Sequence, residues 1–241
     1  MTRLIAALAA TTCLGTLPAP AQDLTEERVR ELALEAILEN PQVVMDAVAI
    51  LQEREAQAAA DQAQTALGEN RAALEQDPNA PVLGNPEGDV TVVEFFDYNC
   101  PYCRRAADEV AALIENDGDV RVVYREWPIL GEGSVFASRA ALAARAQDKY
   151  AELHKAMLGS EGRLDENAVM RIAEEVGLDT DKLRADMEAP EVAEHIDTSM
   201  ALAQSLGFTG TPSFVIGENR APGLIDAEQM RAMIEMARDD G

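Results

Sequence analysis

Aromatic residues are scarce in this sequence: Phe, Trp and Tyr together make up 4% of its 241 residues. Aromatic and β-branched side chains favour strands, whereas Ala and Glu, which are abundant here, favour helices. This balance argues against an all-β fold. Hydrophobic residues nevertheless amount to 47% of the chain, enough to bury one sizeable core and a smaller element. The composition predicts a helix-rich α/β protein.

Basic residues are also few, because 20 Lys and Arg stand against 44 Asp and Glu and give a formal net charge of -24. A surface of this sign repels the phosphate backbone of nucleic acids, so we expect no nucleic acid among the partners. We interpret the excess of acidic residues as a means of keeping the protein soluble.

Long hydrophobic runs are missing after the first residues of the chain. The apolar stretch 4–14 follows Arg3 and is too short to span a membrane, and a triplet of small residues ends at Ala21. This pattern predicts a secretory signal peptide over residues 1–21, cleaved near Ala21, and a periplasmic protein. A lipoprotein would instead need small and aliphatic residues just before Cys13, where two threonines stand.

Cysteine is rare as well, with three in the chain, and Cys13 lies inside the expected signal peptide. The remaining pair, Cys100 and Cys103, is too small a set for a disulfide framework. A bond between them would also close too short a loop to constrain the unfolded chain. In an exported protein, which meets an oxidising compartment, a lone C-x-x-C pair indicates redox chemistry.

Metal binding is the alternative for this pair. A structural zinc site needs two more ligands, but His154 and His195 lie far away in helical patterns, so no metal and no other cofactor is expected. Capture of copper(I) by the two thiols stays open as a binding role, because thiolates are soft ligands.

Three parts follow the signal peptide. Residues 22–76 form a helical, acidic arm in which Val44, Val48 and Leu51 lie on one apolar stripe. Such a helix has no core of its own, so we expect a homo-oligomer through residues 24–76; packing on its own domain and mobility are the alternatives. The prolines of residues 77–86 predict a linker, and residues 87–241 form the main domain.

The main domain alternates strands and helices. Val90–Phe96 and Val120–Tyr124 are apolar runs typical of buried central strands, and the segment between them has helical spacing. Together they predict a parallel strand–helix–strand unit. A helical insertion follows over about residues 134–206. Two short strands, the first at Ser213–Ile216, and a last helix complete the domain.

Cys100, Pro101, Tyr102 and Cys103 follow the first of these strands and open the next helix. Unpaired backbone N–H groups and the helix dipole stabilise a thiolate at this position, so the pKa of Cys100 should fall below its free value of about 8.5. Pro101 suits the first turn because it has no N–H. Cys103 lies deeper in the helix and is the natural resolving thiol.

The run Glu94-Phe95-Phe96-Asp97-Tyr98-Asn99-Cys100-Pro101-Tyr102-Cys103 resembles the active-site run of DsbA-like oxidoreductases, and Thr211-Pro212 resembles that family's cis-proline loop. The resemblance covers about residues 84–241. It implies a thioredoxin fold with an inserted helical domain, here behind an N-terminal helical arm. It also implies that Pro212 is cis and faces the two sulfurs, and that the Thr211 backbone pairs with a client peptide. An ordinary turn before a strand is the alternative for Thr211-Pro212.

Glu94 matches the buried acid that the family places beneath the dithiol. Burial in a central strand would raise its pKa and allow Glu94 to relay the proton of Cys103; a solvent-facing acid or an ion pair is the alternative. His154 is interpreted as a packing residue of an amphipathic helix.

The direction of the reaction depends on a reduction potential, which cysteine chemistry alone does not give. Thr before the proline is similar to disulfide isomerases, whereas DsbA oxidases typically carry Val. The arm resembles that of ScsC (suppressor of copper sensitivity) and Com1-like proteins, in which such an arm assembles several catalytic domains. These resemblances imply a periplasmic isomerase with misfolded exported proteins as clients and a membrane redox partner. The alternatives are a monomeric DsbA-like oxidase and a copper-sequestering protein.

Overall fold

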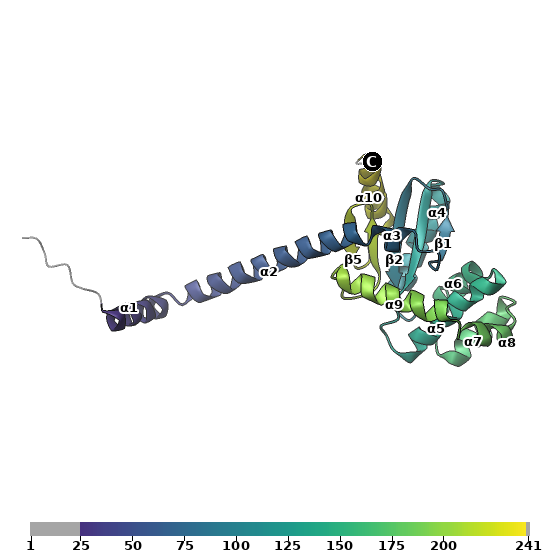
Figure 1. Ribbon diagram of the computed structural model, residues 1–241, viewed down its shortest axis with the longest axis horizontal. Helices are drawn as coiled ribbons and strands as arrows, with labels where there is room; N and C mark the ends of the chain where they lie inside the picture. The colour runs from purple at the N-terminus through teal and green to yellow at the C-terminus, as the bar shows by residue number, and fades with distance from the viewer. Residues whose placement is uncertain (1–24, 240–241) are drawn as a thin grey trace, which may run out of the picture. The chain divides into compact units, whose positions relative to one another are not determined.

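The computed structural model describes residues 25–239. The expected signal peptide, residues 1–21 with Cys13, therefore lies outside the described residues. The chain divides into two compact units, one up to Arg54 and one from Glu55 onward. Figure 1 shows the elements of both in chain order. Within residues 25–239, no helix combines the length and the apolar character that crossing a membrane requires.

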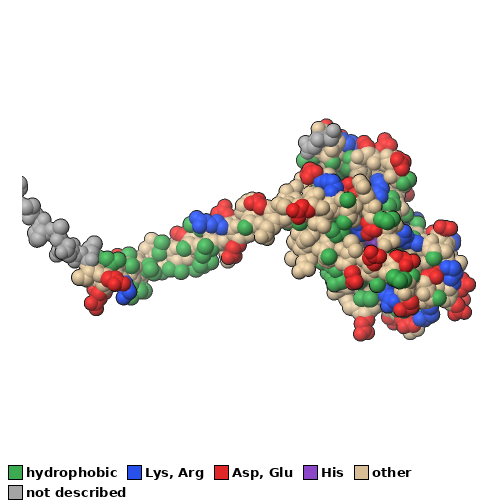
Figure 2. All heavy atoms as spheres, in the orientation of Figure 1, with side chains coloured by type: hydrophobic (Ala, Val, Ile, Leu, Met, Phe, Trp, Pro, Cys, Tyr) green, Lys and Arg blue, Asp and Glu red, His purple; other side chains and the backbone are tan. Residues whose placement is uncertain are grey.

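The first unit contains helix α1 (Glu26–Glu39) and the beginning of helix α2 (Gln42–Glu69). The Thr25 hydroxyl caps α1 by accepting a hydrogen bond from the Arg28 N–H (3.3 Å), and α1 ends before Pro41. No residue of α1 is buried, and hydrophobic side chains lie open along this unit (Figure 2). Its exposed large hydrophobic residues are Val29, Leu32, Leu34, Ile37, Leu38, Val43, Val44, Met45, Val48, Ile50 and Leu51.

The second unit is built on a five-stranded sheet with the order β1-β3-β2-β4-β5. Strands β2 and β3 are parallel, with Phe96 opposite Glu126 at their ends, and the other neighbouring pairs are antiparallel. Helix α4 connects the parallel pair, as the periodicity predicts. The bounds are β1 (Val82–Gly84), β2 (Val90–Phe96), α4 (Pro101–Asn116), β3 (Val120–Glu126), β4 (Ser213–Ile216) and β5 (Asn219–Pro222).

Both faces of the sheet are covered. Val92 and Phe96 of β2 belong to a core cluster with residues of α4 and α10 (Ala227–Asp239), while Val93 and Phe95 belong to a cluster on the other face. That second cluster includes residues of α2, α3 (Arg71–Glu75) and α9 (Pro190–Ser205). Because side chains alternate along a strand, covering both faces requires the continuous apolar runs seen in the sequence.

The chain between β3 and β4 is helical. Its elements are α5 (Glu132–Ala143), a 3-10 turn (Ala144–Gln147), α6 (Tyr150–Leu158), α7 (Glu166–Glu175), α8 (Thr180–Asp186) and α9. The carboxylates of Asp165 and Asp179 cap α7 and α8 by accepting backbone N–H groups of their first turns. This segment corresponds to the helical insertion predicted over residues 134–206.

The segment before β2 differs from the sequence-based expectation. Residues 77–86, expected to form a linker, contain strand β1, which pairs with β3, and the compact unit begins at Glu55. The sequence after Leu51 offers few apolar residues, yet Leu67 and Leu74 are fully buried in the cluster that contains Phe95. The end of α2 and all of α3 therefore pack with the sheet.

A buried arginine fastens this segment to the sheet. Arg125 of β3 is fully buried, and its Nη1 lies 2.6 Å from the Asp77 carboxylate. Its Nη2 donates to the backbone carbonyls of Ala73 and Leu74 at the end of α3. Burial alone would raise the pKa of Asp77, but the hydrogen bonds from Arg125 and from the Asn79 N–H outweigh it and lower that pKa. A charge of this kind stays buried only while it is paired.

Replacing Asp77 by Ala should therefore leave the Arg125 guanidinium buried without its counter-charge. We expect the free energy of unfolding, measured by urea titration, to fall by about 3 kcal/mol. The matched control is Glu166→Ala, which breaks the exposed ion pair with Arg184 and should cost about 0.5 kcal/mol or less. Equal losses in the two variants would contradict a structural role of the buried pair.

Candidate active site

Cys100 lies at the junction between β2 and α4. The strand ends at Phe96 and the helix begins at Pro101, so Cys100 occupies the N-cap position, with φ −80° and ψ 120°. The first backbone N–H groups of a helix have no acceptor within the helix, and the helix dipole is positive at this end. The sulfur of Cys100 is therefore held where negative charge is stabilised.

The surroundings of Cys100 favour its thiolate. Cys100 is 4% exposed, and in its protonated form its thiol donates to the backbone carbonyl of Thr211 across 3.2 Å. Hydrogen bonding from the Cys103 thiol lowers the pKa of Cys100 most, and the Thr211 side chain and the backbone N–H groups of Cys103 and Tyr102 lower it further. Against the opposing effect of burial, the pKa of Cys100 is lowered to about 5. None of these backbone groups makes a full capping hydrogen bond to the sulfur.

Cys103 has the opposite character. It is fully buried, and its sulfur accepts a hydrogen bond from the Asp97 N–H at 3.5 Å. Burial raises the pKa of the Cys103 thiol strongly, and the hydrogen bond to Cys100 and the charge of Glu94 raise it further. Near neutral pH one thiol of the pair is therefore ionised and the other is protonated.

Thr211 and Pro212 approach the dithiol from the loop before β4. The peptide bond between them is cis, and the Thr211 carbonyl is the group that contacts Cys100. Two residues 111 positions apart in the sequence thus meet at the sulfur. The structure thus brings the Thr211 carbonyl to the sulfur of Cys100.

Glu94 lies in β2 on the same side of the sheet as the α4 cluster. It is 3% exposed and stands opposite Tyr124 of β3 and Phe214 of β4, so no basic residue faces it from either strand. Burial, and then the charge of Cys100, raise the pKa of Glu94 to about 8. The carboxyl is close enough to both sulfurs for each charge to affect the other.

The two residues between the cysteines face outward. Pro101 opens α4 and is exposed, and the Tyr102 side chain is 53% exposed. The Arg105 guanidinium lies over the Tyr102 ring, 4.7 Å from its centroid. Tyr102 thus lies at the surface between the two cysteines and is not part of the buried packing around Cys103.

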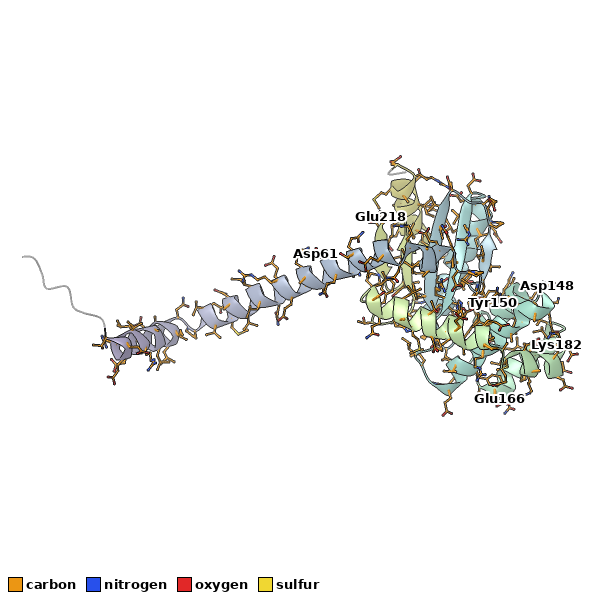
Figure 3. All side chains as sticks on the ribbon, viewed as in Figure 1. Asp61, Asp148, Tyr150, Glu166, Lys182 and Glu218 are labelled. Carbon is orange, nitrogen blue, oxygen red and sulfur yellow. The ribbon has the colours of Figure 1, made fainter. Side chains whose placement is uncertain are left out.

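His154 and His195 belong to a buried polar cluster in which neither histidine makes a hydrogen bond to Cys100 or Cys103. His154 hydrogen-bonds the Tyr98 hydroxyl (3.0 Å), and burial lowers its pKa to about 4. Tyr150, labelled in Figure 3, donates to Glu126 (2.7 Å), which also pairs with His195 (2.7 Å). Among the described residues, no cluster of three or more His, Cys, Asp or Glu is arranged to hold a metal ion.

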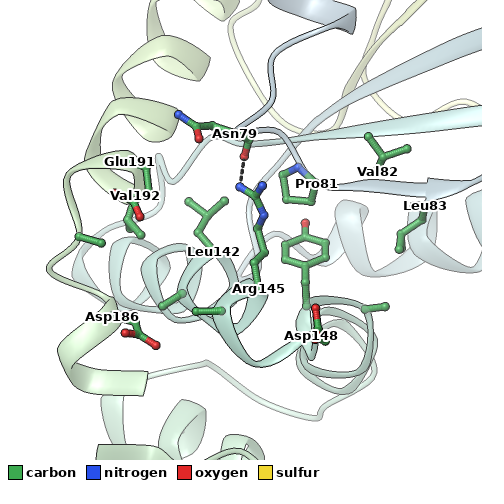
Figure 4. Close-up of a pocket in the computed structure, with 15 residues that line it drawn as sticks. Asn79, Pro81, Val82, Leu83, Leu142, Arg145, Asp148, Asp186, Glu191 and Val192 are labelled. Atoms are coloured by element: carbon green, nitrogen blue, oxygen red, sulfur yellow. Dashed lines mark hydrogen bonds between the residues drawn. The ribbon is translucent and has the colours of Figure 1, made fainter. Parts of the chain in front are cut away.

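A hollow of about 650 Å³ lies between β1 and the helical insertion. Figure 4 shows Arg145 in its wall, where the guanidinium donates to the backbone carbonyl of Asn79. Val82 and Leu83 of β1 and Leu142 of α5 also line it. None of the site residues predicted from the sequence lies there, so we place the candidate active site at the dithiol.

Comparison with known proteins places this arrangement in a family. The family model of the DSBA-like thioredoxin domain matches residues 91–235. A thioredoxin-like oxidoreductase from Silicibacter pomeroyi DSS-3 is 64% identical, with a TM-score of 0.70, over 70% of this chain and 98% of that one. A linker-deleted variant of ScsC from Proteus mirabilis is 25% identical, with a TM-score of 0.70, over 93% of this chain and 100% of that one.

A curated relative is much longer than this chain. The Na(+)/H(+) antiporter NhaA 3 of Salinispora tropica is 32% identical over 158 residues, which are 65% of this chain and 24% of the antiporter. The chain thus spans about a quarter of the length of that relative.

The family model covers more than half of the chain, and the ScsC structure extends the likeness over the helical N-terminal region. These matches confirm the resemblance drawn from the sequence and the predicted fold class, a thioredoxin fold with a helical insertion and an N-terminal helical region. The chain belongs to the DSBA-like thioredoxin-domain family.

Proposed function

We propose that this protein exchanges disulfides of exported client proteins in the periplasm through Cys100, and that it works mainly as an isomerase. The observation that carries the exchange chemistry is the contrast within one dithiol: the pKa of Cys100 is lowered to about 5, while burial raises that of Cys103. A thiol that is ionised near neutral pH is both a nucleophile and a good leaving group, while its partner stays protonated until it has to attack.

The exchange begins when the Cys100 thiolate attacks one sulfur of a client disulfide. A Cys100–client disulfide forms, and the other client sulfur leaves as a thiolate. In isomerisation that thiolate, or another of the client, attacks a client sulfur and finally displaces Cys100 as the thiolate. No electrons are gained or lost overall, so isomerisation needs no external reductant once Cys100 is reduced.

The escape from a stalled mixed disulfide uses Cys103. Its thiol must lose a proton before its sulfur attacks Cys100 Sγ; the client then leaves reduced, and Cys100 and Cys103 become oxidised. Glu94 is the proposed acceptor of this proton. The Cys100 charge raises the pKa of Glu94, and Cys100 carries no charge in the mixed disulfide, so Glu94 ionises more readily at the step that needs a base.

Thr211 and Pro212 form the proposed client-binding edge. The Thr211 carbonyl contacts Cys100, so a client segment paired with this backbone as an added strand would lie beside the sulfur. Pro212 has no N–H, so Thr211 supplies the pairing groups. Tyr102, between the two cysteines, adds an exposed aromatic side chain.

Two features favour isomerisation over oxidation: the N-terminal helical arm and Thr211 before the cis-proline. Open hydrophobic side chains such as Leu38, Val48 and Leu51 need a cover, and other copies of the chain, associated through residues 24–76, would supply it. Several dithiols would then act on one misfolded client, which suits shuffling. The ScsC relative extends over this region. A periplasmic place follows from the proposed signal peptide 1–21, and a membrane redox partner would keep Cys100 reduced.

The thiolate is tested by the pH dependence of Cys100 alkylation. In the reduced chain without residues 1–21, the rate of reaction with iodoacetamide should rise with a midpoint near pH 5 and be close to its maximum at pH 7. The control Cys100→Ser should incorporate no label while folded, because Cys103 is fully buried. The same variant should lose all reactivation of scrambled ribonuclease; client turnover by Cys100→Ser would sink the redox assignment.

Glu94 makes a stability prediction with a definite sign. The pKa of Glu94 in the folded chain, about 8, lies above the ordinary 4.5. The neutral carboxyl therefore makes its full contribution to the free energy of unfolding below pH 4.5, and this contribution is lost as the pH rises through 8. Gln stays neutral at every pH. Between pH 5 and pH 8, the free energy of unfolding of the reduced Glu94→Gln variant should therefore rise relative to that of the unchanged chain, by an amount on the order of a few kcal/mol. Urea titrations at the two pH values measure this, and a constant difference would speak against a buried neutral Glu94.

The relay role of Glu94 has a kinetic signature. Glu94→Gln should slow release of a Cys100–peptide mixed disulfide by about 100-fold, while the alkylation rate of Cys100 at pH 7 stays within about twofold. The matched control is Glu126→Gln, which changes another buried acid on the neighbouring strand and should leave release unchanged. Equal release rates in all three proteins would exclude Glu94 as the proton acceptor.

The arm is tested in the full chain by Val48→Lys with Leu51→Lys. Light scattering should show an oligomer for the unchanged chain and a monomer for this variant, because two charges would enter the apolar stripe. Reactivation of scrambled ribonuclease should fall by about tenfold or more, with insulin reduction unchanged. The control, Glu53→Lys with Gln57→Lys, lies on the other side of the helix by its 100° spacing. Full isomerase activity in a monomer would refute the oligomeric mechanism.

A further inference from the structure

Three residues join β2 to Cys100, and the side chain of each is tied to another part of the second unit. Asp97 is fully buried, and its carboxylate accepts backbone N–H groups of Asn99 (2.8 Å), Ile129 (2.8 Å) and Leu130 (2.9 Å). A carboxylate only accepts hydrogen bonds, and three donors satisfy it. The loop after β3 is thereby fixed to the turn that carries Cys100.

Asn99, the residue just before Cys100, reaches into the helical insertion. Its Oδ1 accepts the Leu164 N–H at 2.7 Å, and its Nδ2 donates to the Leu164 carbonyl at 3.0 Å and to the Ser134 Oγ at 3.2 Å. The amide thus pairs with one backbone residue as a neighbouring strand would. Ser134 belongs to α5 and is fully buried, so Asn99 links two segments of the insertion.

The same stretch of the insertion, residues 162–164, is held again from the other side of Cys100. Arg104 of α4 donates to the Gly162 carbonyl (2.5 Å), and Arg163 donates to the Leu130 carbonyl (2.7 Å). All three consecutive residues of this insertion loop therefore contact elements that surround the dithiol. The loop also passes so close to α5 that a Cβ at Gly133 would clash with the Leu164 carbonyl oxygen.

These ties converge on the geometry of Cys100. The Asp97 carbonyl accepts the Cys100 N–H (3.0 Å), while the Asp97 N–H donates to the Cys103 sulfur (3.5 Å). The backbone on the N-terminal side of Cys100 thus has no freedom of its own, although no capping hydrogen bond fixes the sulfur. The position of the Cys100 side chain therefore depends on Asn99 as well as on the contact of its thiol with the Thr211 carbonyl.

We propose that Asn99 is a positioning residue that couples the reactivity of Cys100 to the helical insertion through residues 162–164. The proposal rests on the proposed function, because it takes the Cys100 thiolate as the nucleophile. If the hydrogen bonds between Leu164 and Asn99 break, the sulfur of Cys100 moves away from the Cys103 thiol and from the first-turn N–H groups that stabilise its charge. A client or partner that binds the insertion can thereby change the reactivity of a dithiol it does not touch.

The test compares Asn99→Ala with Asn85→Ala in the full chain. Asn85 also caps a turn, accepting the Glu87 N–H and donating to the Gly118 carbonyl, but its contacts are with the turn after α4. We expect the alkylation rate of Cys100 at pH 6 to fall about tenfold in Asn99→Ala and to be unchanged in Asn85→Ala. Thermal unfolding of both variants measures their stability, so that a slower alkylation caused by unfolding can be told from one caused by a displaced Cys100.

Ser134→Ala keeps the test decisive if Asn99→Ala does not fold. It removes one acceptor of the Asn99 amide and leaves the Leu164 pair, so it should slow alkylation at pH 6 in the same direction by a smaller factor. An unchanged rate in every variant that folds would overturn the positioning role. A midpoint near pH 9 in the unchanged chain would instead show that the proposed thiolate chemistry is wrong, so the two failures are distinguishable.

Discussion

The chemistry of this protein depends on the turn in which the chain leaves β2 and enters α4 at Pro101. Because the helix starts at once, Cys100 occupies the N-cap and its sulfur meets the unpaired N–H groups of the first turn. Three residues later the helix carries Cys103 into the core, where no water reaches it. Within a single helical turn, the pKa of one cysteine is therefore lowered and that of the other is raised. This difference sets the order in which the two thiols react.

The rest of the second unit holds that turn from several directions. Helices cover both faces of the sheet at β2 and β3, which keeps Glu94 buried. The loop before β4 brings the Thr211 carbonyl to Cys100. The insertion adds the contacts of Asn99. Each support comes from a different part of the chain, so the site exists only when the whole unit has folded.

Sequence reasoning predicted the parts whose signal is local. The Val90–Phe96 strand, the N-cap position of Cys100 and the helix after it follow from periodicity and from the C-x-x-C motif. The cis bond before Pro212 and the acid at 94 came from the family resemblance, because neither has a local pattern that requires it.

Other features had no local signal. Strand β1 is three residues long between prolines, and Leu67 and Leu74 sit in stretches rich in Ala, Gln and Glu. The partners of Asp97 and Asn99 are mostly backbone groups 32 to 65 positions away, and backbone groups leave no trace in the residue letters. Arg125 gave no signal either, since a charged residue inside an apolar strand suggests a surface position. These features depend on tertiary contact.

Arg125 also decides where the chain can be cut. Its guanidinium holds the carbonyls at the end of α3, and Leu67 and Leu74 cover Val93 and Phe95 of the sheet. A fragment that starts at the proline-rich segment after residue 76 would expose this apolar face to water and would remove the two carbonyl acceptors of Arg125, although Asp77 would remain. Proteases that remove the N-terminal helices should therefore leave a stable fragment only when they cleave before Ala63, well upstream of the boundary that the prolines suggest.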